Sequence, residues 1–315
     1  MPLKMARDAK RFYQQYSFMY KDVLPLPIVT NENAMKEFEL MELREDDLFV
    51  VTYPKSGTHW MQEIVHLILV NGHGERLTAK ERRPVIELAD IRSHDPELVA
   101  AAGPVLREMK DVPSPRVLTS HVQYSFLPKQ FLEKRPKIIY IYRHPKDVLV
   151  SLFNFYLSFI RQDVEPAPFG DFFDDFTAGQ VVFGSWFDHV NDYYKHKDDE
   201  NFFALPFEAM KQDLHKVVQD VASFIGKPLD DNSLARVVEG ASFETMKKSF
   251  QKDHEKNVAE GKDVMRANAF VRKGKVGQWK DLLTPAQNKL LDELFREKMK
   301  DCEWTRSYAP DSANE

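Results

Sequence analysis

A short polar segment after an apolar run carries the residue types of a phosphate-binding turn. It reads Pro-Lys-Ser-Gly-Thr-His-Trp and spans 54–60. A lysine, two hydroxyls and the N–H groups at the start of a helix can together hold an anion. Trp60 follows about one turn into the expected helix, where its ring could stack on a flat base. A phosphate beside an aromatic ring predicts a nucleotide site, although a turn that merely needs small residues is the alternative.

A second polar segment ends another apolar run. Arg143 closes the run that begins at Lys137, and Ser151 lies eight residues further on, about two turns along an expected helix. A guanidinium binds phosphate in a bidentate manner, and open α/β sheets bind ligands at the carboxyl ends of their strands. This pattern predicts a second phosphate contact. An ion pair between Arg143 and Asp147 is the alternative.

A third segment lies near the C-terminus, where Arg272, Lys273 and Gly274 stand together. Two cations beside a glycine can surround a phosphate with both side chains and backbone N–H groups. A solvated basic loop is the ordinary interpretation of such a run.

Taken in order, the three segments resemble those of the cytosolic sulfotransferases, whose sulfuryl donor is 3′-phosphoadenosine 5′-phosphosulfate (PAPS). The segment 54–60 resembles the 5′-phosphosulfate loop of that family and lacks the ordinary P-loop pattern. The run 272–280 resembles the signature Arg-Lys-Gly-x-x-Gly-Asp-Trp-Lys, with Gln278 where the family usually has Asp. The run 183–189 resembles the family's Gly-Ser-Trp-Phe-Asp-His. The resemblance implies an α/β fold: one domain with a central parallel sheet flanked by helices and a P-loop-like phosphosulfate-binding loop.

The resemblance also implies the donor site. Arg143 and Ser151, with the segment 272–274, would hold the 3′-phosphate that distinguishes PAPS from ATP. Phe243 matches an aromatic residue at the adenine, whereas Phe207 stands where the family usually has a tyrosine and can pack but cannot donate a hydrogen bond. The implied donor-binding residues are Lys55, Ser56, Gly57, Thr58, His59, Trp60, Arg143, Ser151, Phe207, Ser242, Phe243, Arg272, Lys273 and Gly274.

His121 is the expected general base, and it follows a short strand expected over 116–120. An imidazole is mostly neutral at pH 7 and can accept the proton of an attacking hydroxyl, which is worth ~10²–10⁴ in rate. A lone histidine is more often structural. Its position at a strand end, in a chain with three donor motifs, favours catalysis here. The resemblance implies that Lys55 stabilises charge on the departing 5′-phosphate.

The acceptor-binding residues are expected from their position relative to the family's motifs. They are Val85, Leu88, Phe153 and Phe155. Aliphatic residues at the first two positions could widen the pocket toward bulky alcohols, or they could simply pack the segment that contains them. The expected acceptor is a small lipophilic molecule such as a steroid, a bile alcohol or a phenol, sulfonated at a hydroxyl or an amine.

Two other functions compete with this interpretation. A nucleotide or small-molecule kinase would want a lysine directly after glycine and an acidic strand end that holds magnesium, and neither is present. A non-catalytic nucleotide-binding protein that has kept the fold would be favoured by loss of Lys55 or His121. Both residues are present.

Composition excludes several other classes. The chain has 315 residues, of which 43% are apolar, and a net charge of −5, so no basic field indicates nucleic acid. Cys302 is the only cysteine, which rules out an internal disulfide. The N-terminus lacks a signal-peptide pattern, and no stretch approaches the ~20 apolar residues of a membrane span. We therefore expect a cytoplasmic protein without membrane association, and no zinc pattern or other metal site is expected.

Strands and helices are expected to alternate along the chain, which predicts a parallel sheet covered on both faces. The expected strands span 48–53, 116–121, 137–143 and 202–205, and the expected helices 60–70, 147–160, 211–225, 230–250 and 284–300. The whole chain, 1–315, is expected to be one sulfotransferase domain. Within it we expect an irregular N-terminal arm over 1–45, a substrate-lining insertion over 71–115 and a mobile lid over 251–270.

The oligomeric state is predicted from one short segment. The family often dimerises through a Lys-x-x-x-Thr-Val-x-x-x-Glu sequence, and the matching run here has Pro285 in place of valine and Lys289 in place of glutamate. Two such changes should weaken a small self-complementary contact. A monomer or weak homodimer is therefore expected.

Overall fold

Four parallel strands form the centre of the molecule, in the order β4-β3-β5-β6. They are Leu48–Thr52 (β3), Val117–Ser120 (β4), Lys137–Tyr142 (β5) and Phe202–Pro206 (β6). The computed structural model describes residues 17–21, 24–27, 30–73, 85–88, 105–158, 168–259 and 274–308. Because β3 pairs in parallel with both β4 and β5, the carboxyl ends of these strands meet at one edge of the sheet. The predicted donor segments that follow β3 and β5 begin at that edge.

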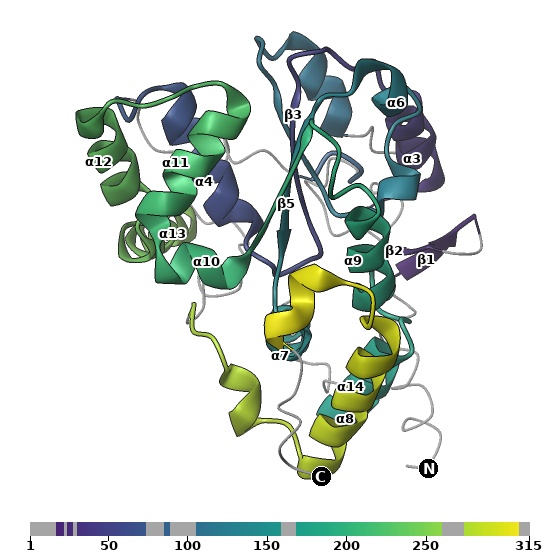
Figure 1. Ribbon diagram of the computed structural model, residues 1–315. Coiled ribbons are helices and arrows are strands. Elements are labelled where there is room, and N and C mark those ends of the chain that lie inside the picture. The colour runs from purple at the N-terminus through teal and green to yellow at the C-terminus, as the bar shows by residue number, and fades with distance from the viewer. Residues whose placement is uncertain are drawn as a thin grey trace.

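Helices cover both faces of the sheet (Figure 1). Alternate residues of β3 enter two separate cores: Leu48 and Val50 pack into one, and Phe49 and Val51 into the other. Such alternation with apolar residues on both sides is typical of a buried parallel strand. The first core is covered by Thr58–Leu69 (α4), Phe207–Gln212 (α10), Leu214–Ile225 (α11), Asp231–Gly240 (α12) and Phe243–Ala259 (α13).

The other face carries helices that the sequence did not reveal. They include Glu32–Glu39 (α3), Phe131–Lys134 (α6), Phe169–Thr177 (α8) and Trp186–Tyr194 (α9), which pack with Pro145–Leu157 (α7) and Pro285–Lys298 (α14). Short 3₁₀ helices span Val105–Asp111 (η1), Tyr124–Phe126 (η2), Gln278–Asp281 (η4) and Glu303–Tyr308 (η5). Among the described helices, none is long and apolar enough to cross a membrane.

The predicted strands are all present, but several helix boundaries differ. The helix expected over 211–225 is two helices, because Asp213 ends α10 and its carboxylate caps α11 by accepting from the Lys216 N–H. The helix expected over 230–250 also divides, at 241–242, into α12 and α13. The last helix is as predicted, with Thr284 as N-cap in a capping box and a proline at its first position.

Two of the expected segments are more ordered than the sequence indicated. The arm expected to be irregular contains α3 and an antiparallel pair of strands, Ser17–Tyr20 (β1) and Leu24–Pro27 (β2). The first nine residues of the expected lid belong to α13, and 260–270 lie outside the described residues.

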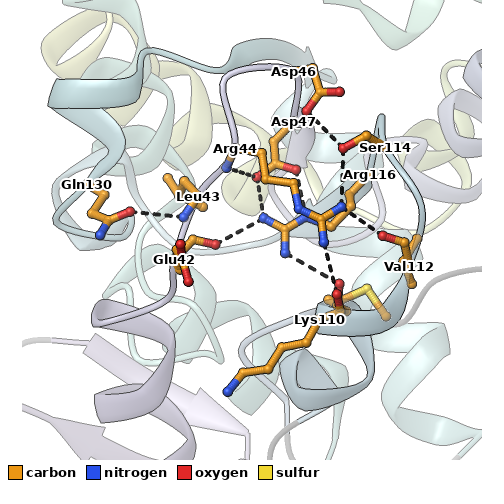
Figure 2. Close-up of polar contacts among 11 residues, drawn as sticks. Glu42, Leu43, Arg44, Asp46, Asp47, Lys110, Val112, Ser114, Arg116 and Gln130 are labelled. Carbon is orange, nitrogen blue, oxygen red and sulfur yellow. Dashed lines mark hydrogen bonds and ion pairs between the residues drawn. The ribbon is translucent and has the colours of Figure 1, made fainter.

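Two arginines, Arg44 and Arg116, connect the amino end of the sheet to neighbouring segments through polar contacts (Figure 2). Arg116 precedes β4, and its guanidinium makes a bidentate ion pair with Asp47, the residue before β3. Its side chain is 4% exposed and that of Asp47 is 0% exposed. Arg44 donates to the carbonyls of Lys110 and Val112 in and after η1, at 2.9 and 2.8 Å. These contacts hold the start of two strands to the segment that precedes β4.

Candidate active site

The turn after β3 has a backbone that favours glycine. Lys55 and Gly57 both have positive φ, 70° and 114°, and α4 begins directly afterwards at Thr58. A Cβ on Gly57 would lie 2.9 Å from both Phe207 Cδ2 and Met210 Cε. Only glycine therefore fits both the backbone and the space at this position.

The same turn contains a polar side chain that a ligand could bind. Ser56 is fully buried, and its Oγ has no hydrogen-bond partner in the described part of the chain. The first N–H groups of α4 have no acceptor within the helix, and the helix dipole favours an anion there. The Ser56 N–H donates to the Tyr53 carbonyl at 3.2 Å and so already has a partner. A buried hydroxyl beside a helix start fits a phosphate group.

His121 lies beside this turn, because β4 and β3 are neighbours in the sheet. Its Nδ1 is 2.7 Å from the Thr52 carbonyl oxygen. A carbonyl can only accept, so Nδ1 carries the proton and Nε2 is left as an acceptor. Thr52 Oγ1 also lies 2.7 Å from Thr58 Oγ1, which ties the histidine to the first residue of α4. The arrangement gives His121 the tautomer that a general base requires.

The electrostatic surroundings keep His121 neutral. Burial is the main cause that lowers the pKa of His121 to about 4; the Thr52 hydrogen bond opposes it, and the charge of Lys55 adds to it. The ring meets Phe183 edge-on, with ring centroids 5.3 Å apart. At neutral pH the imidazole is therefore unprotonated and ready to accept a proton.

The Lys55 side chain extends toward α7. Its Nζ lies 4.2 Å from the centre of the Phe155 ring, on α7. An ammonium over an aromatic face is attracted to it, which orders the side chain. A residue predicted to act on the donor therefore contacts one predicted to line the acceptor site.

Arg143 joins two loops that the sequence assigned to the donor. Its guanidinium donates to the Lys55 carbonyl at 3.0 Å and to the Lys275 carbonyl at 3.3 Å, and it lies 4.4 Å above the Phe207 ring. Asp147 does not act as the ion-pair partner proposed as the alternative. Its carboxylate instead accepts from the N–H groups of Gly277 and Gln278, at 2.7 and 2.9 Å.

Three aromatic rings from distant segments meet at the start of α4. The Trp60 ring centroid lies 5.7 Å from that of Phe207 and 5.9 Å from that of Phe243. The indole Nε1 donates to the Ala241 carbonyl at 2.7 Å, which fixes the ring. Gly274 approaches this cluster so closely that a Cβ there would lie 2.2 Å from Phe243. The predicted phosphate loop and the predicted adenine residues are thus in contact.

The sequence matches known proteins over most of its length. A model of the sulfotransferase domain matches residues 45–303. The chain belongs to the sulfotransferase family. The amine sulfotransferase of Oryctolagus cuniculus is 37% identical over 272 residues, covering 85% of this chain and 85% of that protein. Sulfotransferase 2B1 of Mus musculus is 36% identical over 283 residues, covering 90% of this chain and 80% of that protein.

Solved structures agree with this assignment. Mouse sulfotransferase SULT7A1, crystallised with PAP, has a TM-score of 0.74 at 33% identity, and the match covers 93% of this sulfotransferase and 97% of that chain. Retinol dehydratase, with a TM-score of 0.73 at 21% identity, shares the fold. The predicted family, enzyme class and α/β fold are confirmed.

Two predicted donor residues of this sulfotransferase are not described, and two other predicted site residues make contacts within the protein. Arg272 and Lys273 lie outside the described residues. Ser242 Oγ lies 2.6 Å from Thr245 Oγ1 and accepts from the Thr245 N–H at the start of α13. Phe153 packs against Phe169 and Phe172, with ring centroids 5.1 and 5.5 Å apart, rather than beside Lys55.

The Val85–Leu88 segment extends the sheet next to β4. Val85 forms a parallel bridge with Thr119, and the Ile86 N–H donates to the Thr119 carbonyl at 2.9 Å. Leu88 packs against the core on the α9 side. The expected acceptor-lining segment is therefore placed directly beside the strand that leads to His121.

Several residues of the site were missed from the sequence. Thr52 sets the tautomer of His121, Phe183 packs on its ring, and Glu87 and His189 hydrogen-bond its backbone. Two of these had a signal: Glu87 is an acidic residue inside an apolar run, and His189 ends the run 183–189. Among the described residues no group of three potential metal ligands is found.

Proposed function

We propose that this sulfotransferase moves a sulfuryl group from PAPS to a hydroxyl or amine of a small lipophilic acceptor. The observation that carries the proposal is the state of His121, whose Nδ1 proton is fixed on the Thr52 carbonyl and whose pKa is lowered to about 4 by burial. The acceptor-facing Nε2 is then a base at neutral pH. The relative solved with PAP supports the choice of donor.

In the proposed step, the acceptor oxygen attacks the sulfur in line with the bridging oxygen of PAPS. The acceptor proton passes to Nε2 of His121 as the new S–O bond forms. The bond between sulfur and the bridging oxygen breaks, and its electron pair stays on the 5′-phosphate of the product PAP. Because the pKa of His121 is low, the imidazolium returns its proton to solvent readily.

Lys55 is the proposed counter-charge for the departing phosphate. Its backbone conformation and its contact with Phe155 hold it at the turn where the buried Ser56 hydroxyl and the α4 N-terminus lie. Donors that are ordered before the reaction stabilise developing charge without reorganising. Thr58, whose hydroxyl meets that of Thr52, and the His59 N–H would complete the contacts to the 5′-phosphate.

The 3′-phosphate and the adenine are assigned to the neighbouring contacts. Arg143 lies between the Lys55 turn and the segment after Gly274, which is where a second phosphate would bridge the two loops. Ser151, Arg272 and Lys273 are proposed to complete that phosphate site. The aromatic cluster of Trp60, Phe207 and Phe243, together with Ser242, is proposed to hold the adenine.

The acceptor class is proposed from the residues near His121. Val85 and Leu88 belong to the segment that pairs with β4 through Val85, and Phe155 contacts Lys55. These apolar residues and Phe153 favour a steroid, bile alcohol or phenol, and the name of the rabbit relative adds an amine. We further expect a cytoplasmic protein that is a monomer or weak dimer at low micromolar concentration, as light scattering would measure.

Transfer of radiolabel from PAPS to a mixed acceptor panel tests the proposal. The panel contains phenols, steroids, bile alcohols and aryl amines, and binding of PAP is measured in parallel by calorimetry. We expect label on at least one acceptor, and little label with His121→Ala although this variant still binds PAP. A protein that binds PAP but transfers no label to any acceptor would instead be the non-catalytic nucleotide binder.

A further inference from the structure

The backbone of His121 is held on both sides by buried side chains. The His121 N–H donates to Glu87 Oε1 at 2.7 Å, and the His121 carbonyl lies 3.0 Å from His189 Nε2. With Nδ1 bound to the Thr52 carbonyl, every polar group of His121 except Nε2 has a partner in the described chain. Three separate elements therefore fix one residue: the Val85–Leu88 segment, α9 and β3.

His189 can act only as a structural donor to His121. Its Nε2 faces a carbonyl and must carry the proton, so its Nδ1 accepts from the Tyr140 hydroxyl at 2.9 Å. The ring is fully buried and packs between Tyr53 and Tyr140, with ring centroids 5.4 and 5.7 Å away. Burial lowers the pKa of His189 to about 3, so it stays neutral and keeps this single tautomer.

Glu87 is a buried carboxyl group beside the His121 backbone. It is 0% exposed, its Oε1 accepts from the His121 N–H, and its Oε2 has no partner among the described residues. Burial raises the pKa of Glu87 to about 7. A buried carboxyl group whose second oxygen is unsatisfied is costly, and such groups cluster at functional sites.

Glu87 also belongs to the acceptor side of the site. Val85 and Leu88, on either side of it, are the proposed acceptor-lining residues, and the Thr30 hydroxyl donates to the Glu87 carbonyl. The Ile86 N–H fixes the same segment to Thr119, two residues before His121. The wall of the acceptor site and the base are thus joined through one side chain.

We propose that Glu87 and His189 are positioning residues of the transfer reaction, which hold the His121 backbone from both sides so that Nε2 meets the acceptor hydroxyl. This inference rests on the proposed function, in which His121 is the base. Neither residue touches the reacting atoms; each acts through His121. A displacement of about 1 Å in a catalytic group can cost about 10²-fold in rate, so loss of either contact should lower turnover.

Two pairs of variants separate loss of the contact from loss of the side chain. His189→Phe keeps a ring in the aromatic cluster and removes the Nε2 donor, whereas the amide N–H of His189→Gln can still reach the His121 carbonyl. Glu87→Ala removes the acceptor of the His121 N–H, whereas Glu87→Gln keeps one. We expect kcat to fall roughly 10–100-fold in the first member of each pair and less than about threefold in the second. KM for PAPS and the Kd for PAP should stay within about twofold in all four.

The decisive measurement repeats His189→Phe and Glu87→Ala in a His121→Ala background. A residue that acts only through His121 has no further effect on kcat once His121 is absent, because the contributions of coupled residues are not additive. A general structural role would lower kcat by the same factor in both backgrounds. Equal factors in the two backgrounds, or unchanged kcat in the single variants, would overturn the inference.

Two controls keep this result interpretable. Thermal unfolding and circular dichroism verify that each variant is folded. If His189→Phe does not fold, the Glu87 pair still tests the positioning of the His121 backbone, through its N–H instead of its carbonyl. A wild-type enzyme that transfers label, with single variants as fast as wild type, contradicts only the positioning role. A wild-type protein that transfers no label contradicts the proposed function, and the positioning role with it.

Discussion

Polar groups at the amino end of the sheet are paired with one another, whereas some at the carboxyl end have no partner among the described residues. At the amino end, Arg116 and Asp47 satisfy each other, and the guanidinium adds contacts to the carbonyls of Glu42 and Met109. At the carboxyl end, Ser56 Oγ has no partner within the described residues, and His121 presents Nε2 with no bond to any of them. Ser56 is as buried as Arg116 and Asp47, so the difference between these groups lies in their pairing and not in their exposure.

This difference indicates that the polar groups of the amino end stabilise the fold and that those of the carboxyl end serve the reaction. A buried charge that is fully paired fixes the elements around it, whereas a buried polar group without a partner can be satisfied by a ligand. Substitutions at the amino end should therefore change the free energy of unfolding and leave turnover per folded molecule intact. Substitutions of the unpaired polar groups at the carboxyl end should do the reverse.

The largest effect is expected for His121→Ala. Loss of the base should lower kcat by ~10²–10⁴. The midpoint of thermal unfolding should fall less than in Asp47→Ala, because only the neutral Thr52 carbonyl loses a partner. The matched control is His215→Ala, which removes an exposed histidine on α11 and should leave kcat unchanged. Steady-state kinetics with the best acceptor of the panel measures both. Near-normal turnover of His121→Ala would remove the distinction between the two ends.

Asp47→Ala should have the largest effect on stability. It leaves the Arg116 guanidinium buried without its carboxylate, and breaking such a pair costs about 3–5 kcal/mol. Glu37→Ala is the control, because it removes an exposed ion pair with Arg107 and should cost less than about 1 kcal/mol. Urea unfolding gives both free energies. The contrast would be wrong if Asp47→Ala were as stable as Glu37→Ala, or if it lost kcat per folded molecule.

An intermediate effect is expected at the donor turn. Alanine at Gly57 would meet a positive φ of 114° and contacts at 2.9 Å to Phe207 and Met210, which should cost about 1–3 kcal/mol. The Kd for PAP should rise as well, because the turn carries the proposed phosphate contacts. Gly170→Ala is the control. Gly170 lies in the first turn of α8 with nothing within 4 Å, so alanine there should be neutral or stabilising by up to about 1 kcal/mol. Equal Kd values for PAP in the two variants would place the phosphate elsewhere.

The sequence was sufficient for the fold and for the donor turn, because both depend on local patterns. The apolar run 48–53 and the turn after it specify a buried strand and a helix start within a few residues of one another. The end of the helix expected over 211–225 was also local information, since Asp213 is a typical N-cap, but the apolar periodicity on either side of it obscured the break.

The groups that control His121 could not be predicted in the same way. Thr52, Glu87 and His189 are separated from His121 by 69, 34 and 68 residues, and their contacts exist only because β3, the Val85–Leu88 segment and α9 are brought together in the fold. The sequence marks a histidine at a strand end but not its tautomer. Likewise, the Phe155 contact with Lys55 depends on how α7 packs against the sheet.

The pH dependence of kcat/KM tests whether the pKa of His121 is as low as its surroundings indicate. The base is active only when neutral, and the pKa of His121 is lowered to about 4 by burial and by Lys55. At pH 5.5 about 97% of such a group is neutral, against about 10% of an ordinary histidine with a pKa of 6.5. We expect kcat/KM for the acceptor to change less than about twofold between pH 7 and 5.5, and to fall only as the pH approaches 4. His189 and His144 also have lowered pKa values, so these groups take up protons in the unfolded chain before they do so in the folded chain, and their contribution to stability is lost as the pH falls below about 6.5. The raised pKa of Glu87 acts in the opposite direction. Circular dichroism at each pH separates that unfolding from titration of the base. A tenfold loss of kcat/KM by pH 5.5 in folded protein would show that water reaches the imidazole, and that the two ends of the sheet differ less than their pairing suggests.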